Sequence, residues 1–475
     1  MKNLNKILAM SVVALLIVAS GSVAQEEIFF LGEELGVGAR AMGMGGAYVG
    51  VADDYSAMYW NPAGLGQINR MEVNVGFSHN KIVNTASFDP QSTDLVPTDA
   101  NSIKSEDTYS RLNSLGVTIP VPTFQGSLVF GVGYNKVRDF DNRFNIEGYN
   151  EGWAAYPDFF YQMAEDYQYT TVENNLYQKQ SIIEQGALNT FSIAGSIELQ
   201  ENFFLGATVN FIGGKDDYSM EFSEHDIYNL HNVYQDYDQD GNENISDLDE
   251  WTYQQSIVSE FRGTNLKLGA LYGFGRALRI GATVTPPTTY KIKETWADSW
   301  DEYYDSGDEF HVEEESGVTN YKIRTPYTFS FGASMKVLNF LFTAGADFQD
   351  WSQAEFLNDP PILGETKNEV NRRIATDFKS ITKLRLGAEM FIPIVRAKVR
   401  AGWFQDPSPY RFTDVRPDKD YITAGASLML DKQVLVDLSY SRGSWKRETI
   451  DYLTNSPALE DITLEKVVGT LSIRF

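Results

Sequence analysis

The sequence lacks cysteine altogether and is poor in positive charge. Its 475 residues include 39 Lys and Arg against 65 Asp and Glu, which gives a formal net charge of −26 at pH 7. Without cysteine the chain can form neither disulfide bonds nor thiolate metal sites. The acidic balance argues against a nucleic-acid partner, because phosphates are bound by basic surfaces.

Long hydrophobic runs are also missing beyond the first residues. No transmembrane helix is therefore predicted, since one needs about 18 consecutive apolar residues. At the start of the chain, Lys2 and Lys6 precede an apolar stretch at 7–19, which is too short for a span, and Ser22 and Ala24 suit a cleavage site. We therefore expect residues 1–24 to be a secretory signal peptide.

Aromatic residues, in contrast, are plentiful: the chain has 26 Tyr, 29 Phe and 8 Trp, yet its mean hydropathy is only −0.30. A transmembrane β-barrel combines these properties, because only alternate residues of its strands face lipid. In FQGSLVFGVGYNK at 124–136, Phe124, Leu128 and Phe130 occupy even positions, and the odd positions are mostly small or polar. This period of two predicts a strand with one apolar face.

Similar alternation predicts about fourteen strands, an even number as in bacterial single-chain barrels. The expected strands are residues 70–80, 109–120, 124–139, 187–199, 203–216, 255–273, 277–296, 319–336, 339–351, 379–391, 394–407, 418–430, 433–445 and 461–475. Their connections alternate between short and long, as periplasmic turns and outer loops do, and a soluble β-sandwich would not explain this. We expect an all-β fold: a transmembrane antiparallel β-barrel over residues 70–475 with long extracellular loops.

The segment before the first expected strand, residues 25–69, does not alternate and cannot face lipid. A fourteen-stranded barrel leaves an interior that its own wall side chains do not fill. We therefore expect residues 25–69 to be an N-terminal hatch, or plug, in the lumen. Its glycines, Gly43, Gly45 and Gly46 among them, allow close packing, and Pro62 ends any helix at the preceding residue.

The stretch GARAMGMGGAYVGVADDYSAMYWNPAGL at 38–65 resembles the start of the FadL/TodX family of outer-membrane transporters. The matching residues are Ala52-Asp53-Asp54 and Asn61-Pro62-Ala63, beside the glycines. The resemblance implies a fourteen-stranded barrel with a hatch, in the outer membrane of a bacterium. It also implies passive uptake of hydrophobic molecules such as long-chain fatty acids, with lipid and lipopolysaccharide as surroundings.

Two other functions remain open, because the PorV-like barrels of type IX secretion share GARAMGMGGA and WNPAGL almost as well. The chain would then be an accessory barrel that holds a protein partner. A structural or adhesive surface barrel is the third alternative. A transporter needs a continuous apolar path that reaches the hatch, whereas an accessory barrel needs a protein-docking surface on its outer loops.

Inward-facing cations are candidate ligands for a substrate carboxylate. If residues 392–393 form a two-residue turn, Arg385 lies opposite Arg400 and Glu389 opposite Arg396, with Lys398 nearby. Two arginines across a ladder repel each other unless an anion lies between them. That anion is either a ligand carboxylate or an acid of the hatch or lumen, and the second arrangement is the commoner one in charged barrel interiors.

An acidic outer segment, DYDQDGNENISDLDEW at 236–251, is a candidate calcium site. Its ligands would be Asp236, Asp238, Asp240, Asn242, Asp247 and Asp249. The spacing is not that of a regular EF-hand loop, although carboxylates at every second residue suit a hard cation. A calcium site and a plain acidic loop tip both remain open.

An aromatic outer loop at 149–178 is too apolar for an ordinary solvated loop. Its candidate groove residues are Trp153, Tyr156, Phe159 and Phe160. The family resemblance implies a first, weak groove for apolar substrate here. The alternative is packing of loop against loop.

The sequence contains no sign of an enzyme. Its histidines are His79, His225, His231 and His311, all in expected outer loops or at the outer end of a strand. No Ser/His/acid set can be placed on one wall, and no phosphate-binding or metal-hydrolase motif is present. We expect no catalytic residues and no required cofactor.

Overall fold

The computed structural model describes residues 36–475 except for 89–101, 151–175, 230–233, 238–242, 247, 276, 306, 308, 362–364, 412–416 and 452–455. The expected signal peptide at 1–24 lies outside the described residues. No helix among the described residues is long and apolar enough to cross a membrane.

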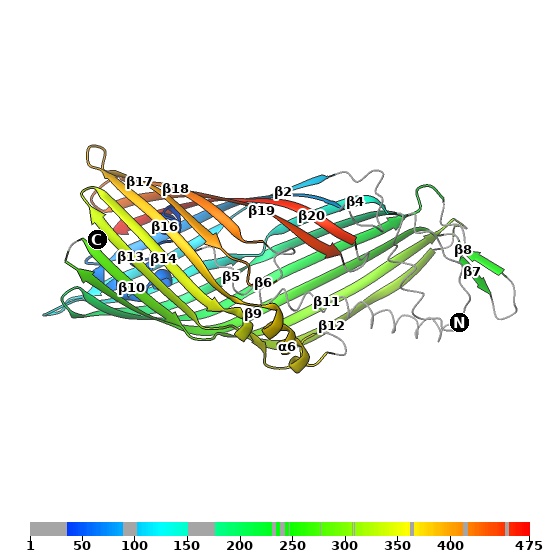
Figure 1. The fold of residues 1–475 in the computed structure, drawn as a ribbon, viewed down its shortest axis with the longest axis horizontal. Helices are drawn as coiled ribbons and strands as arrows, with labels where there is room; N and C mark the ends of the chain where they lie inside the picture. The colour runs from blue at the N-terminus through cyan, green and yellow to red at the C-terminus, as the bar shows by residue number, and fades with distance from the viewer. Residues whose placement is uncertain are drawn as a thin grey trace.

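The described strands form one closed antiparallel barrel with fourteen strands in its wall, as predicted (Figure 1). The wall consists, in chain order, of β1 (Glu72–Phe88), β2 (Ile103–Val121), β3 (Leu128–Asp139) continued by β4 (Asn142–Asn150), β5 (Leu176–Gln200), β6 (Phe203–His225), β9 (Leu248–Phe274), β10 (Leu278–Thr285) continued by β11 (Thr289–Tyr304), β12 (Glu309–Arg324) continued by β13 (Thr328–Val337), β14 (Phe340–Asp350), β16 (Ser380–Ile392), β17 (Ala397–Asp406), β18 (Lys419–Met429), β19 (Val434–Asp451) and β20 (Ser456–Arg474).

The barrel closes because β1 pairs with both β2 and the last strand, β20. An ion pair reinforces this seam, since Arg474 Nε lies 2.7 Å from the buried Glu72 carboxylate. Prolines interrupt two of the wall strands. Pro286 and Pro287 separate β10 from β11, and Pro326 separates β12 from β13, because proline cannot donate a ladder hydrogen bond.

An apolar belt covers the outward face of the barrel at its short-turn end. Phe130, Phe191, Phe211 and Leu268 are each between 42% and 50% exposed there, although they are large and hydrophobic. A closed barrel with such a belt is what spans a bilayer, because every backbone group in the wall is paired. The alternation predicted from the sequence is therefore confirmed as an outward apolar face.

The wall strands continue well beyond this belt, which the sequence prediction missed. The strand expected at 255–273 is β9 (Leu248–Phe274), and the one expected at 187–199 is β5 (Leu176–Gln200). About 9–11 residues suffice to span a bilayer, so the 27 residues of β9 extend far outside it. Outside the lipid the outward positions of β9 are mostly polar, and its apolar residues, Trp251, Tyr253 and Phe261 among them, face inward. The outward apolar face therefore ends although the strand pairing continues (Figure 1).

The chain from residue 36 to residue 68 lies inside the barrel, and we call it the luminal segment. It contains α3 (Ala39–Gly43), α4 (Ala57–Trp60) and the 3-10 helix η1 (Pro62–Gln67). As predicted, the helix before Pro62 ends just before it, at Trp60, with Asn61 extended. Most of its side chains are fully buried.

One short helix, α6 (Lys367–Asp377), lies at the outer ends of β14 and β16, in a stretch predicted as loop, while β11 and β12 continue beyond it (Figure 1). We call this place, where the shorter wall strands end, the outer mouth. The helix is followed along the chain by β16 and preceded by the 3-10 helix η2 (Trp351–Gln353) and by β15 (Glu355–Phe356), which pairs with β12. Thr366 and Glu369 form a capping box that starts α6. Val370 and Ile374 form its buried face, one turn apart.

Candidate functional site

The luminal segment approaches the wall most closely at positions where the wall residue is glycine. A Cβ atom on Gly402 of β17 would lie 2.3 Å from the amide nitrogen of Gly45, and one on Gly387 of β16 would lie 2.4 Å from the Met44 carbonyl oxygen. Gly387 and Gly402 are direct cross-strand partners. Gly45 itself has a φ of +63° and faces backbone atoms of Trp403, so only glycine fits on either side.

The same arrangement recurs around the circumference. The paired wall glycines are Gly116 and Gly133 beneath Tyr55, Gly206 and Gly269 beneath Asn61 to Ala63, and Gly281 and Gly332 beneath Val49 and Gly50. The opening motif and these small wall residues are therefore two halves of one contact surface. The glycines of the motif were predicted to permit close packing, and they do so backbone against backbone.

Asn61 of the motif connects three parts of the structure. Its side-chain amide donates to the Val49 carbonyl oxygen at 2.9 Å and to the Ala270 carbonyl oxygen of β9 at 3.1 Å. Its Oδ1 accepts the Ala63 amide at 3.1 Å, at the start of η1. Since Asn61 is completely buried, no water can replace these bonds.

The two adjacent acids of the motif have different partners. Asp53 forms an ion pair with Arg40, and Asp54 accepts the Tyr48 hydroxyl at 2.7 Å. Arg40 also binds Glu389 of the wall, with Nε 2.9 Å from the carboxylate. Arg40 was not singled out from the sequence, although it is the one basic residue between 25 and 69. That solitary positive charge, in a segment whose other charges are all acidic, was the signal that could have identified it.

The predicted pairings Arg385 with Arg400 and Glu389 with Arg396 are wrong. The turn between β16 and β17 comprises residues 393–396, four rather than two, and Arg396 lies within it at a φ of +52°. This shifts the register, so that Arg400 lies opposite Glu389 and Arg385 lies opposite Phe404. The length of that turn was the assumption that failed.

The three candidate cations of the lumen, Arg385, Lys398 and Arg400, are each paired with an acid. Arg400 lies 2.8 Å from Glu389 and 2.9 Å from Asp437, and Lys398 lies 2.8 Å from Glu389. Arg385 lies 2.9 Å from Asp347. The interpretation that acids of the lumen and luminal segment neutralise these cations therefore agrees with the geometry. A role of Arg385, Arg400 or Lys398 in binding ligand stays a prediction.

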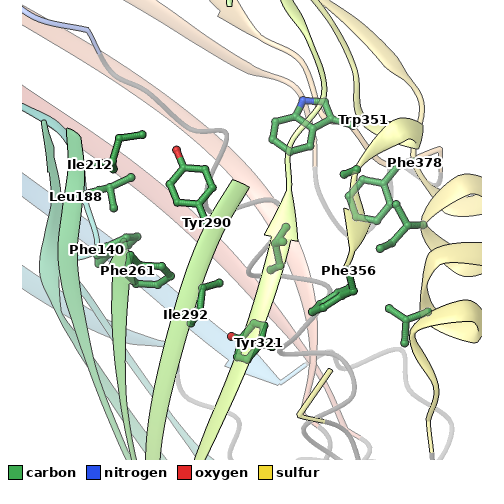
Figure 2. Close-up of a cluster of buried hydrophobic side chains, with 14 of the residues drawn as sticks. Phe140, Leu188, Ile212, Phe261, Tyr290, Ile292, Tyr321, Trp351, Phe356 and Phe378 are labelled. Atoms are coloured by element: carbon green, nitrogen blue, oxygen red, sulfur yellow. The ribbon is translucent and has the colours of Figure 1, made fainter. Parts of the chain in front are cut away.

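An apolar cluster follows the inner wall from the outer mouth down to the luminal segment (Figure 2). Its members include, from the wall, Val137, Phe140, Leu188, Ile212, Phe261, Tyr290, Ile292, Tyr321 and Ile323, and from the mouth Trp351, Phe356, Val370, Ile374 and Phe378. Tyr59 of the luminal segment packs against this cluster and also against the core of the segment itself. The apolar surface is therefore continuous between mouth and segment.

A cavity of about 120 Å³ lies where this cluster meets the luminal segment. Ile212, Tyr290 and Trp351 line it from the cluster, and Tyr59 and Trp60 line it from the segment. Polar side chains such as Asn135, Asn210 and Gln349 also line it, together with four charged ones, Lys267, Asp347, Lys383 and the predicted site residue Arg385. The cavity thus offers aromatic and aliphatic surface together with hydrogen-bonding and charged groups.

The pairing between β2 and β3 stops short of their outer ends. Their ladder ends at Ser114 opposite Asn135, and beyond a bulge at 136–138 β3 continues to pair with β5 alone. Side chains take over there, since Arg111 lies 2.6 Å from Asp141. Backbone hydrogen bonds between β2 and β3 are therefore missing over this part of the described wall.

The structure describes only some of the candidate residues in the aromatic loop and in the acidic segment. The aromatic loop with Trp153, Tyr156, Phe159 and Phe160 lies outside the described residues. The acidic segment contains a small hairpin, β7 (Tyr234–Tyr237) with β8 (Glu243–Ser246). Most of its candidate ligand side chains are not described, and Asp249 is exposed with its carbonyl oxygen accepting the Asp226 amide. Within the described residues no acidic or histidine group could hold a metal, so calcium stays a prediction.

No family model and no curated protein matches the sequence. Among solved structures, the Pseudomonas putida toluene transporter TodX is similar, with a TM-score of 0.57 and 11% identity over 93% of this chain and 99% of that chain. A Pseudomonas aeruginosa FadL homologue has a TM-score of 0.56 and 12% identity over 92% and 98%. The Ralstonia pickettii toluene transporter TbuX has 0.52 and 14% over 93% and 99%.

These likenesses extend over nearly the whole of both chains, and at such low identity they show the fold. The chain is a transmembrane β-barrel of the fold found in TodX and the FadL homologue. The resemblance in fold predicted from residues 38–65 is thereby confirmed. The fold and the outward apolar belt agree with the expected location in the bacterial outer membrane.

Proposed function

We propose that the chain is an outer-membrane channel for the passive uptake of hydrophobic molecules such as long-chain fatty acids. The observation that carries this proposal is the apolar cluster that continues from α6 at the outer mouth to Tyr59 of the luminal segment. A barrel that only holds a protein partner has no use for such a path. The structural neighbours named as toluene transporters support the same general class.

The body of the substrate, rather than its charge, is expected to provide most of the binding energy. Arg385 and Arg400 already have carboxylate partners in Asp347, Glu389 and Asp437. A fatty-acid carboxylate would have to compete with these acids, whereas an alkyl or aryl group only needs the apolar surface. Neutral hydrocarbons and fatty acids therefore both suit the lumen.

Passage is proposed in two stages. Substrate moves from the mouth along the apolar cluster into the cavity above the luminal segment. It then leaves either when the luminal segment acts as a hatch and shifts, or sideways between β2 and β3, where backbone pairing stops at Ser114 and Asn135.

The proposal is tested by binding and uptake with one variant in the path and one outside it. Ile212→Glu places a charge in the cavity lining, and Val468→Glu places the same charge on the inner wall of β20, outside the cluster. Loss of the buried Ile212 contact should weaken binding of a long-chain fatty acid and of toluene by about tenfold or more. Val468→Glu should leave both unchanged.

Binding would be measured by titration of the purified barrel in detergent, and uptake in proteoliposomes. If neither ligand binds the unaltered protein, the channel proposal fails and a protein partner on the outer loops becomes the better explanation. If both variants weaken binding equally, the path is not the one assigned here.

A further inference from the structure

Three cations lie side by side on the outward face of the barrel. Arg262 on β9 is the direct cross-strand partner of Lys291 on β11, and Lys291 is the direct partner of Lys322 on β12. All three side chains are exposed. Within the part of the chain that the structure describes, none of them has an ion-pair partner.

The cations next to this row, in contrast, have acidic neighbours. Arg324, one residue pair closer to the membrane, forms an ion pair with Glu355, and Lys215 lies 2.6 Å from Asp217. Lys293, one pair farther out, lies opposite Glu260. Acids are therefore present beside the neighbouring cations but not in the row itself, in a chain with 65 acidic residues against 39 basic ones.

Such a row is unfavourable by itself. Adjacent strands are about 4.8 Å apart, so three positive charges occupy roughly 10 Å across three strands. Like charges directly opposite each other on a sheet destabilise the pairing. An anion with several oxygen atoms would remove this repulsion.

The row lies immediately above the lipid-facing belt. On β9 the outward residue Leu266 is 39% exposed, and Arg262 follows two outward positions farther from the short turns. On the wall strand that carries Lys322, Tyr327 between β12 and β13 and Phe329 on β13 form the edge of the belt, 46% and 39% exposed. Since the short turns are at the opposite end, this edge is at the headgroups of the outer leaflet.

We propose that Arg262, Lys291 and Lys322 bind the phosphate groups of lipopolysaccharide in the outer leaflet. Guanidinium and ammonium groups are the usual protein partners of phosphate, and clusters of them at a bilayer surface bind anionic headgroups. The apolar belt below takes the acyl chains of the same lipid. The site rests on the proposed location in the outer membrane but not on any substrate of the lumen.

The test uses the full-length barrel, purified in detergent and freed of lipid. Its ligands are lipid A with both phosphates and the same lipid after enzymatic removal of the phosphates. The variant is Arg262→Gln/Lys291→Gln/Lys322→Gln. The matched control, Arg70→Gln/Lys336→Gln/Lys432→Gln, removes three exposed cations at the short-turn end.

We expect the triple variant to bind phosphorylated lipid A about tenfold more weakly or worse, and the control to bind it like the unaltered protein. Dephosphorylated lipid A should bind the unaltered protein as weakly as the phosphorylated lipid binds the variant. Equal affinity of variant and unaltered protein, or equal affinity for the two lipids, would overturn the proposal. Folding of every variant is checked by heat-dependent gel mobility. Binding of hydrophobic ligands in the lumen, measured on the same samples, should not change, so failure of this site and failure of the channel are distinguishable.

Discussion

The close contact between wall and luminal segment makes a sharp prediction for Gly402→Ala. Ordinary contact begins at 3.4 Å, and the new Cβ would lie 2.3 Å from the Gly45 amide nitrogen, so the two backbones must separate by about 1.1 Å (3.4 − 2.3). The wall strand itself tolerates alanine, because its backbone is extended. The strain therefore acts on the docking of the segment.

Overpacking of this kind costs about 1–3 kcal/mol. At about 1.36 kcal/mol for each tenfold change, the docked segment becomes roughly 5- to 150-fold less favoured. We expect larger single-channel conductance in planar bilayers. We also expect trypsin to cut after Arg40, the sole basic residue of the segment, which is shielded by Asp53 and Glu389 when docked.

The matched control is Gly345→Ala, also on the inner wall, where the nearest atom to a new Cβ is a carbonyl oxygen 3.4 Å away. It should behave like the unaltered protein in both assays. A second variant, Gly387→Ala, is expected to repeat the effect because its Cβ would lie 2.4 Å from the Met44 carbonyl oxygen. If both variants leave conductance and the Arg40 site unchanged, the backbone-to-backbone docking is refuted.

Three further predictions concern individual side chains. Asn61→Ala removes the hydrogen-bond partner of two buried carbonyl oxygens and of the Ala63 amide. It should lower the free energy of unfolding of the barrel by about 2–4 kcal/mol, measured by thermal unfolding. A loss below about 0.5 kcal/mol, the level of a surface substitution, would contradict the assigned bonds. Arg385→Ala leaves Asp347 buried without its cation and should cost about 3–5 kcal/mol. Both residues line the cavity, but the guanidinium already binds Asp347, so fatty-acid affinity should stay within about twofold. A large loss of affinity at unchanged stability would instead support binding of the ligand carboxylate by Arg385. The backbone and side-chain hydrogen bonds from Thr366 hold the pKa of Glu369 below its usual range, so the capping of α6 is complete above the ordinary carboxyl pKa and is lost as pH falls through the lowered one. Hydrogen exchange of α6 should accelerate in that window. Glu369→Gln, which has no carboxyl group to titrate, should remove this pH dependence.

The strands were predictable from sequence because lipid imposes a period of two on them. Phe130, Leu268 and Phe329 are exposed where a soluble protein would bury them, and their alternation with small residues revealed the wall. The outer ends were not predictable in this way. Beyond the belt the apolar residues of β9, such as Trp251 and Tyr253, face inward, so the outward apolar pattern that marks a lipid-facing strand stops before the strand does.

The interior was harder to predict, because its contacts join distant parts of the chain. Arg40 and Glu389 are 349 residues apart, and nothing in the local sequence of either indicates the other. A two-residue error in one turn was enough to place Arg385 opposite Arg400. Helix α6, in contrast, carried local signals that were passed over: Thr366 and Glu369 have capping-box spacing, and Val370 and Ile374 are one turn apart.

The luminal segment bridges the seam of the barrel, which has a consequence for the order of folding. The Ala39 amide donates to Thr470 of β20 at 3.1 Å, across 431 residues, and the Tyr55 amide donates at 3.0 Å to Glu72 of β1, which also binds Arg474. The part of the chain made first therefore has no complete binding surface until the last strand is in place. Contacts this distant in sequence form slowly, because long loops must close before they are made. Closure of the wall and docking of the luminal segment are thus one event. A chain truncated before β20 should have neither a closed wall nor a docked luminal segment.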